Sequence, residues 1–516
     1  MISRLEKWDR IFIIAFLVLI GLHLAMFLSL RILPFVDLPN HLAAATIVKN
    51  YDDSQNDFEQ FFESDPNLRP NTFHLFLCSL DIFPSVEFGN KVFYALYIIL
   101  LPLSVLFLIR KAGGDPWLSL LSFLMLYNYN VLWGFVGFTM ALPLIFFMLG
   151  FMLDLFNKFS LKTVLILGLM FPALFFVHGI AALFALLAFA VLTFLNCGKS
   201  LQKISLSALA ILPYLALHIG WYSIRSEGYG FSQITSYLSK YYSAQYLAEF
   251  ANRFNVILFD NYYVFEGVNG DITALLFALA LMTPFLWQIF SARQAFLDQM
   301  KDRRMRTVFF FSAIALSCAF ILPKDVLYDP TLLYQRIAVF FMISVLVLGS
   351  HWRLVRKKMP LKIAIILICL THFGLWTEYF NGFQKENESF TAGVLRQDGY
   401  AQPMAYLPAD PFYRGLPSYI HFQNYRIVWN QGIASTSLID YVFGAVKRKA
   451  PKEILPPHTP WISRMGYTGQ YDEMNYLLIR GNPGVQLKRH LLHSKGFELL
   501  KLEGEWALLG KPHQNQ

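Results

Sequence analysis

The sequence predicts a polytopic α-helical membrane protein with about eleven transmembrane helices, followed by a small α/β domain outside the membrane. Three observations predict this. The 516 residues are 56% hydrophobic and only 15% charged, and the mean hydropathy of +0.45 is well above that of soluble domains. Apolar stretches of near-spanning length recur up to about residue 380. Lysine and arginine residues cluster in the short segment that follows every second apolar stretch, as they do in cytoplasmic loops.

Eleven stretches meet the requirement for a spanning helix, which is about 20 apolar residues with a tolerated range of about 17 to 25. The first is too long for the apolar core of a signal peptide, so we expect it to be a retained span. The predicted spans are residues 11–32, 91–109, 117–132, 134–153, 163–177, 179–196, 204–223, 272–291, 307–323, 335–350 and 361–379.

Lysine and arginine placement predicts the direction of these spans, because short cytoplasmic loops are enriched in both residues. Five basic groups are each separated from the next by two spans, which puts all five on the cytoplasmic side with the N-terminus. The rule also favours a helical hairpin broken near His178-Gly179 over one long helix. The five groups are Arg110-Lys111, Lys158 and Lys162, Lys199 and Lys203, KDRRMR from Lys301, and RLVRKK from Arg353.

Three longer segments then fall on the outer side. Leu33 to Asn90 carries nine acidic residues against Lys49 and Arg69. The tyrosine-rich stretch 223–271 is typical of a helix lying on the bilayer surface. Residues 381–516 contain YLLIRG, a helix-like VQLKRHLLHSKG, FELLKLEG and EWALLGK, which predict short strands around a helix. We therefore predict a transmembrane domain over 1–380, with outer loops 33–90 and 223–271, and an outer α/β domain over 381–516.

Charge and cysteine content narrow the function classes. The net charge of +9 follows from membrane topology, so no nucleic-acid partner is indicated. The four cysteines lie in apolar segments without paired spacing, which predicts neither a disulfide framework nor a zinc site. No cofactor is expected, and a divalent metal is an option that no pattern indicates. The cysteines are Cys78, Cys197, Cys318 and Cys369.

A first span, an acidic first outer loop with a juxtamembrane helix, further spans and an outer C-terminal domain together resemble the GT-C superfamily of integral-membrane glycosyltransferases. In sequence the resemblance lies in VDLPNHLAAA from Val36 and, more weakly, in YNYNVLWGFVGFTMALPL from Tyr127. It implies transfer of a sugar from a polyprenyl-phosphate carrier, with an acidic residue of the first outer loop as general base. The matching residue is Asp37. Leu38 and Pro39 replace the paired acids of DxD or Asp-Glu motifs, which weakens any metal role.

The chemistry of glycosyl transfer from a lipid phosphate can be argued independently, and it also fits Asp37 and His41. Displacing a lipid phosphate from a sugar needs a base for the acceptor hydroxyl and cations for the departing phosphate. Asp37 and His41 share one face if a helix runs through PNHLAAATIVK, so His41 could touch phosphate or orient the base. Two alternatives stay open: Asp37 could simply cap that helix, and His41 could be hydrogen-bonded to water or backbone.

Further binding candidates lie at the outer ends of other spans. Arg336 follows an outer loop that holds Lys324 and Asp329, and a guanidinium there, with Lys324, could hold a carrier phosphate. The alternative is an arginine that reaches the headgroups or pairs with Asp329. Asn130 and Trp133 could line a sugar cavity, although an interfacial turn would look the same.

The sequence thus predicts an inverting glycosyltransferase that moves a sugar from a polyprenyl-phosphate donor to a hydroxyl of a lipid or glycan acceptor in the cell envelope. Its expected location is the bacterial inner membrane, among membrane lipids, with the N-terminus cytoplasmic and the C-terminal domain periplasmic or extracellular. A lipid or polysaccharide transporter or flippase is the first alternative, which predicts internal repeats and broken helices near the midplane. A non-catalytic membrane scaffold is the second, because a lone aspartate is compatible with it.

Overall fold

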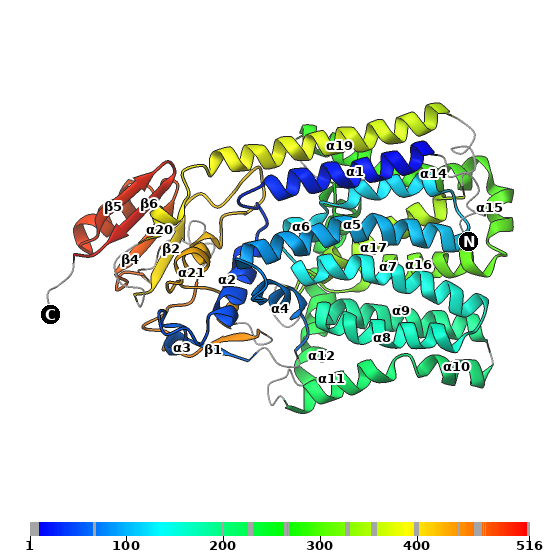
Figure 1. The fold of residues 1–516 in the computed structure, drawn as a ribbon, viewed down its shortest axis with the longest axis horizontal. Coiled ribbons are helices and arrows are strands. Elements are labelled where there is room, and N and C mark those ends of the chain that lie inside the picture. Colours follow the sequence, from blue (N-terminus) through cyan, green and yellow to red (C-terminus); the bar gives the residue numbers. More distant parts are fainter. Residues whose placement is uncertain are drawn as a thin grey trace. The chain divides into compact units, whose positions relative to one another are not determined.

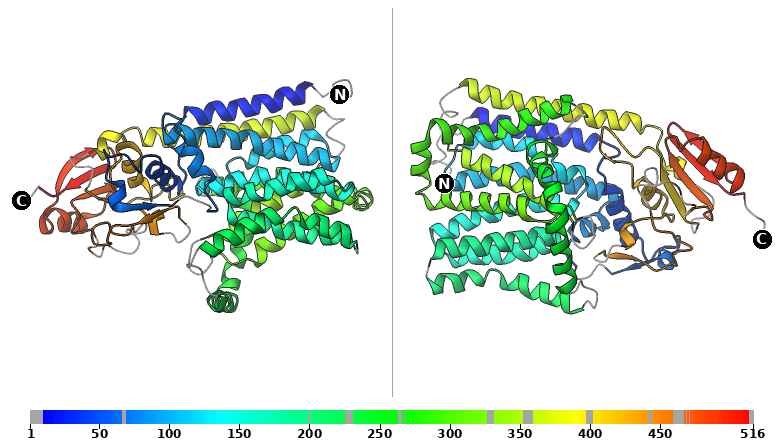
Figure 2. Two further views of the ribbon diagram at one scale, coloured as in Figure 1. Left: turned by 60° about the horizontal axis from the view of Figure 1, so that its bottom comes forward. Right: turned by 180° about the vertical axis from the view of Figure 1, so that it is seen from behind.

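The structure is a computed structural model. It describes residues 10–65, 69–198, 200–224, 231–262, 266, 268–325, 331–351, 359–396, 402–440, 444–458, 467, 469 and 471–512. The chain packs as two compact units, which Figures 1 and 2 show from three directions. One comprises residues 1–29, 94–131 and 137–378, and the other residues 30–93, 132–136 and 379–516.

Within the described residues, seven helices are long and apolar enough to cross a membrane. A bent pair, α10 (Leu201–Ala208) and α11 (Leu212–Ile224), makes an eighth if it counts as one span. Two apolar helices are shorter, α8 (Leu161–Val177) and α17 (Leu333–Gly349). The seven are α1 (Arg10–Ser29), α5 (Val86–Ala112), α7 (Val136–Asn157), α9 (Gly179–Cys197), α14 (Val268–Ser291), α16 (Arg303–Ile321) and α19 (Met359–Glu386).

These helices confirm a polytopic α-helical fold. The predicted hairpin break is present, because α8 ends at Val177 and α9 begins at Gly179. The helices of the first unit run side by side in Figure 1, and α17 is buried along almost its whole length. Gly349 at its end lets α14 approach closely, since a Cβ there would lie 2.8 Å from the backbone nitrogen of Phe285.

One predicted span has a different structure. Instead of a spanning α-helix over 117–132, the chain forms a ten-residue 3₁₀ helix, η2 (Pro116–Met125), followed by the short α6 (Tyr129–Leu132). The hydroxyls of Ser119 and Ser122 each donate to a carbonyl three residues earlier, at 2.7 and 2.6 Å. Such local bonding competes with the α-helical pattern. The apolar composition is explained by burial, because every residue from Trp117 to Met125 is buried.

The tyrosine-rich outer segment is helical, as predicted. It comprises α12 (Phe231–Lys240) and α13 (Tyr246–Asn255), with π-helical turns at η3 (Tyr241–Gln245) and η4 (Val256–Asp260). In the right-hand view of Figure 2 this helix crosses the ends of the bundle helices rather than running along them. Several of its apolar side chains are exposed, including Leu247 and Phe254. Its location on the bilayer surface stays a prediction.

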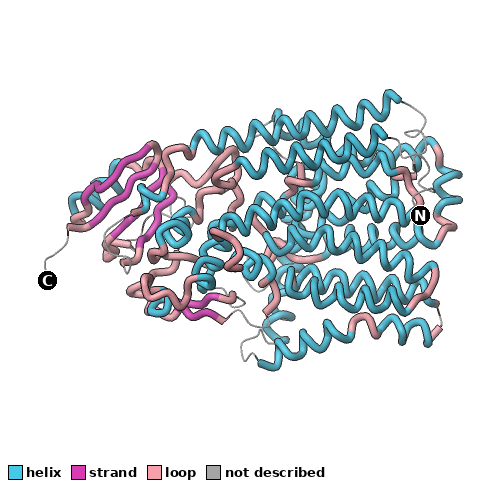
Figure 3. The backbone as a smooth tube through the Cα atoms, in the orientation of Figure 1, coloured by secondary structure: helices cyan, strands magenta, loops and turns pink. Residues whose placement is uncertain are grey.

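The C-terminal tail forms the predicted strands around a helix, coloured magenta and cyan in Figure 3. Its four-stranded sheet has the order β2-β4-β6-β5, in which β2 and β4 are parallel and the other pairs are antiparallel. The strands are β2 (Met404–Pro408), β4 (Tyr476–Arg480), β5 (Glu498–Glu503) and β6 (Trp506–Gly510), and α23 (Val485–Arg489) with η7 (His490–Ser494) joins β4 to β5.

The first outer loop packs with this tail in the second unit. It contains α2 (Leu38–Lys49), α3 (Phe58–Phe61), β1 (Phe62–Ser64) and α4 (Phe73–Ser79). Strand β1 pairs antiparallel with β3 (Val446–Arg448) of the tail. Ala43 and Ile47 of α2 share a core with Ile427 and Ile433. Burying this apolar surface ties the start of α2 to the tail.

Candidate functional site

Asp37 is held by backbone hydrogen bonds at the start of α2. It occupies the N-cap position, and Pro39 lies in the first turn, where its missing N–H costs nothing. The N–H of Val36 donates to the carbonyl of Leu132 at 3.0 Å, and that of Asp37 to the carbonyl of Trp133 at 3.1 Å. The backbone position of Asp37 is therefore set by residues far along the chain. Trp133 contributes its carbonyl here, and its ring stacks on Phe135.

The side chain of Asp37 does not cap its helix. Among the described residues, no helix N–H donates to the carboxylate. Its Oδ1 instead lies 3.3 Å from Nε2 of His421, with 32% of the Asp37 side chain exposed and 6% of that of His421. The carboxylate of Asp37 is therefore partly accessible to solvent, and the buried imidazole of His421 lies beside it. The geometry gives no support to a purely capping role.

A buried polar network joins α2 to the segment that carries His421. The Oδ1 atom of Asn40 accepts from Nδ2 of Asn424 at 2.7 Å and from the hydroxyl of Thr436 at 3.1 Å. The Nδ2 atom of Asn424 also donates to the carbonyl of His421 at 3.1 Å. Asn40 lies three residues after Asp37, so the network fixes both partners of the Asp37–His421 contact.

A second histidine adjoins His421. The ring of His458 meets that of His421 edge to face, with 5.4 Å between centroids. Its Nε2 lies 2.6 Å from the carbonyl oxygen of Ile420, and a carbonyl only accepts, so Nε2 carries the proton. Burial lowers the pKa of His458 to about 3, and the neighbouring His421 acts in the same direction. His458 is therefore neutral at physiological pH.

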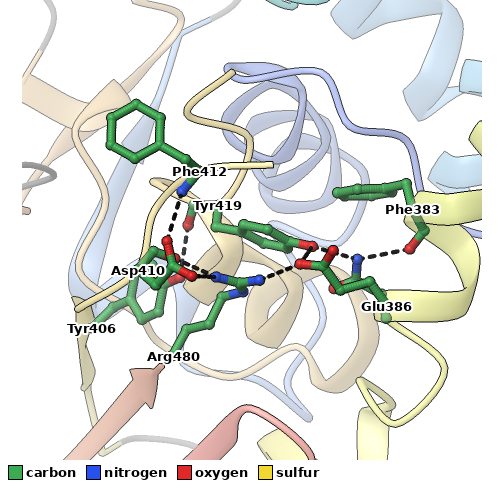
Figure 4. A network of polar contacts seen from close by, with 8 residues as sticks. Phe383, Glu386, Tyr406, Asp410, Phe412, Tyr419 and Arg480 are labelled. Atoms are coloured by element: carbon green, nitrogen blue, oxygen red, sulfur yellow. Dashed lines mark hydrogen bonds and ion pairs between the residues drawn. The ribbon is translucent and has the colours of Figure 1, made fainter. Parts of the chain in front are cut away.

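Figure 4 shows a network of polar contacts around Tyr419 in the same segment. The guanidinium of Arg480 lies 3.4 Å from the ring centroid of Tyr419. It pairs with Glu386 at 2.5 Å and with Asp410 at 3.4 Å. The hydroxyl of Tyr419 donates to Glu386 at 2.8 Å, and its carbonyl accepts from Tyr406 at 2.7 Å. Tyr419 is two residues before His421, so this cluster restrains the position of that imidazole.

His41 lies one turn further along α2, as the predicted helix requires. Its ring is 5.9 Å from that of His74 in α4, in an edge-to-face arrangement. Burial lowers the pKa of His74 to about 3, and the charge of His41 adds to this, against a hydrogen bond with Asn90. The structure places the imidazole of His421 beside Asp37, and the predicted role of His41 stays a prediction.

Arg336 and Asn130 come together in the first unit, as part of a separate group. The Nδ2 atom of Asn130 donates to the carbonyl of Arg336 at 3.3 Å. The Nη1 atom of Arg336, near the start of α17, lies 3.1 Å from Nε2 of His178. His178 precedes α9, and its Nδ1 faces the N–H of Ala181 at 3.3 Å.

One more donor approaches the imidazole of His178 than it can accept from. A neutral imidazole has one lone-pair nitrogen, yet the guanidinium of Arg336 and the N–H of Ala181 approach its two nitrogens. Both approaching groups are donors, so the ring cannot serve both. A guanidinium can also form charge-assisted, bidentate hydrogen bonds with the oxygens of an anion such as a phosphate.

The outer loop before α17 is described only in part. Asp329, the alternative partner of Arg336, lies outside the described residues. The carbonyl of Lys324 accepts from the N–H of Leu333 at 2.7 Å, so Lys324 lies close to the first turn of α17. Burial raises the pKa of Asp325, against the charge of Lys324. A phosphate-binding role for Lys324 stays a prediction.

The contacts made by His421 and His178, and the supporting role of Gly134, were not predicted. His421 lies in IHFQNYRIVW, where no spacing links it to the first outer loop. His178 marks the predicted helix break, and a single histidine at the end of a span is more often a hydrogen-bonded packing residue than a ligand. No group of three or more His, Cys, Asp or Glu side chains within the described ranges is arranged to hold a metal ion.

Gly134 has a conformation that its position requires. Its φ is +74°, and a Cβ there would lie 2.7 Å from the backbone nitrogens of Asp37 and Leu38. We expect Gly134→Ala to displace Asp37. If Asp37 is the general base that the resemblance implies, the substitution should lower turnover about 10²-fold, the cost of misplacing such a group by about 1 Å. Gly198→Ala is the matched control, because Gly198 also has a positive φ (+57°) but open space around it. Equal turnover of the two variants in a label-transfer assay would contradict this prediction.

Comparisons with known proteins show the fold. No family model and no curated protein matches the chain. The crystal structure of ArnT from Cupriavidus metallidurans bound to undecaprenyl phosphate superposes with a TM-score of 0.55 and 12% identity, covering 99% of each chain. The apo structure of the same protein gives a TM-score of 0.54 and 13% identity, covering 98% of this chain and 99% of ArnT. The chain therefore shares the overall fold of ArnT.

Proposed function

We propose that this protein is a membrane glycosyltransferase that moves a sugar from a polyprenyl-phosphate carrier to a hydroxyl of a cell-envelope acceptor. The observation that carries the proposal is the position, exposure and contact of the Asp37 carboxylate. Its carboxylate follows the first span, leaves its helix uncapped, stays partly exposed and contacts a buried histidine. The shared fold with ArnT, which was crystallised with undecaprenyl phosphate, supports the donor class.

The proposed reaction is a single displacement. Asp37 takes the proton of the acceptor hydroxyl, and the resulting oxygen forms a bond to C1 of the sugar while the bond from C1 to the carrier phosphate breaks. Attack opposite the leaving group inverts the anomeric centre. Negative charge grows on the departing phosphate, so fixed donors at that position lower the barrier. We assign that role to Arg336 with His178, near the N-termini of α17 and α9.

The remaining assignments complete the proposal. Lys324 is a further phosphate contact, Asn130 and Trp133 contact the sugar, and His41 contacts phosphate or orients the base. The reaction needs no metal, because the guanidinium can carry the phosphate charge. The orientation follows the basic loops, with the N-terminus in the cytoplasm and the tail on the outer side of a bacterial inner membrane.

The bent pair α10–α11 is the feature that a transporter would share, since broken helices often line transport sites. The bend is 49°, and the residues between the two helices are Leu209, Ala210 and Ile211. The side chains at the break are apolar, so they offer no polar side-chain ligand to a substrate.

A donor panel tests the proposal. Purified protein in detergent is given radiolabelled polyprenyl-phosphate sugars and an envelope-lipid extract, and both label transfer and release of carrier phosphate are measured. We expect turnover by the wild type. We also expect a loss of about 10²- to 10³-fold in kcat/KM for Arg336→Gln, the usual cost of removing a charge-stabilising donor. Arg336→Lys keeps the charge without the planar fork, so we expect partial activity.

Two outcomes would contradict the proposal. Wild-type protein that binds these donors without turning any of them over would favour the scaffold interpretation. Unchanged kcat/KM in Arg336→Gln would remove Arg336 from the phosphate site. The thermal unfolding midpoint of each variant shows whether a loss of turnover comes from a loss of fold.

A further inference from the structure

We infer that His421, contributed by the C-terminal tail, is the positioning residue of Asp37: its neutral imidazole holds one carboxylate oxygen and leaves the other to take the acceptor proton. This inference rests on the proposed function, in which Asp37 is the base. It deepens that proposal by giving the tail a part in the reaction. The contact joins Nε2 of His421 to Oδ1 of Asp37 at 3.3 Å.

The surroundings of His421 indicate which nitrogen carries its proton. An ionised carboxylate can only accept, so the nitrogen that faces Asp37 is the one that bears hydrogen. The other nitrogen, Nδ1, is buried and has no hydrogen-bond partner among the residues that the structure describes. A second proton there would make a buried donor without an acceptor, which is unfavourable. The neutral Nε2–H form avoids that cost.

The ring is also held in place from several sides. Its backbone carbonyl accepts from Asn424, which in turn donates to Asn40 on α2. The ring of His458 packs against its edge, and that ring is neutral, so it brings no charge. Side chains locked in this way hold a catalytic group within a narrow range of geometry. The described contacts therefore suit orientation of the carboxylate rather than relay of a proton.

The positioning role of His421 follows from the path of the proton that the acceptor hydroxyl loses. The acceptor hydroxyl loses its proton to Asp37 as its oxygen bonds to C1, and the product state contains a carboxylic acid that later releases the proton to water. The N–H of His421 stays on Oδ1 throughout and is neither gained nor lost. Losing this donor should let the carboxylate rotate away from its productive orientation, which lowers kcat and leaves the KM for the donor unchanged.

Two substitutions at the same position test the inference. His421→Leu removes the donor and keeps an apolar side chain of similar size, and we expect kcat to fall about 10²-fold with an unchanged KM for the polyprenyl-phosphate sugar. His421→Gln has an amide nitrogen that can donate near the position of Nε2 but cannot take up a proton, so we expect it to restore most of the lost kcat. The measurements are steady-state label transfer and thermal unfolding of the same preparations.

The tail provides a matched control. His490 also places Nε2 near a carboxylate, 3.1 Å from Oδ1 of Asp472. We expect His490→Gln to retain the kcat of the wild type, because neither residue belongs to the described network around Asp37. A fall in its kcat as large as that of His421→Leu would show a general effect of altering the tail, and would overturn the inference.

The outcomes separate this inference from the proposed function. Normal kcat in His421→Leu, with Asp37→Asn inactive, overturns the positioning role and leaves Asp37 as the base. Turnover by Asp37→Asn overturns the proposed function itself. Folded His421→Gln with a kcat as low as that of His421→Leu also overturns the inference, because the imidazole would then act as more than a donor. If His421→Leu does not fold, His421→Gln decides alone. A kcat near that of the wild type supports the positioning role, and a kcat about 10²-fold lower overturns it.

Discussion

Asp37→Asn is expected to lower turnover about 10²- to 10⁴-fold, the range that general acid–base catalysis contributes. Asparagine has nearly the shape of aspartate, and its carbonyl oxygen can still accept from His421. It cannot take the proton of the acceptor hydroxyl. Because the carboxylate makes no helix cap, the exchange removes the base while the start of α2 keeps its backbone bonds to Leu132 and Trp133.

The matched control is Asp57→Asn. Asp57 lies in the same outer loop, at the N-cap of α3, and it too makes no helix-capping bond. Its carboxylate instead accepts from the amide of Gln60 at 2.8 Å. We expect this variant to turn over like the wild type. Equal loss in both variants would indicate a general need for the charge of the loop. Normal turnover of Asp37→Asn would leave Asp37 with a structural role only, and the base would have to be sought elsewhere.

Arg480→Met is expected to have the largest effect on stability. Arg480 is almost fully buried, stacks on Tyr419, and pairs with Glu386 and Asp410. Removing one partner of a fully buried pair costs about 3–5 kcal/mol, mainly because a charge stays behind without a partner. Here the side chains of Glu386 and Asp410 are 36% and 61% exposed, so water can solvate them. We therefore expect a smaller loss, about 2–3 kcal/mol.

Thermal unfolding of the purified protein measures this loss as a lower midpoint. The control is Lys301→Met, which breaks an exposed pair with Asp298 and should leave the midpoint nearly unchanged, because exposed ion pairs contribute little to stability. Arg480→Met should also reduce turnover, because Tyr419 lies two residues before His421. An unchanged midpoint would show that the cluster in Figure 4 contributes no net stability.

The helical part of the fold was largely predictable from the sequence. A span must contain an unbroken apolar stretch, which is a local property of the chain, so α1, α7 and α9 are close to their predicted bounds. The hairpin at His178-Gly179 followed from basic loops on both sides. Residues 117–132 are the instructive exception. They are apolar because they are buried among other helices, and composition alone does not distinguish a buried 3₁₀ helix from a lipid-facing span.

The site was predictable only in part. Local patterns in the chain were enough to predict that an aspartate starts a helix directly after the first apolar helix, and that an arginine lies near the start of another apolar stretch. The contacts of Asp37 with His421 and of Arg336 with His178, and the core that the first loop shares with the tail, became visible only in the folded structure. The physical reason is that capping and apolar periodicity act between neighbours in the chain. Side-chain pairing instead depends on which distant segments bury their apolar faces against each other.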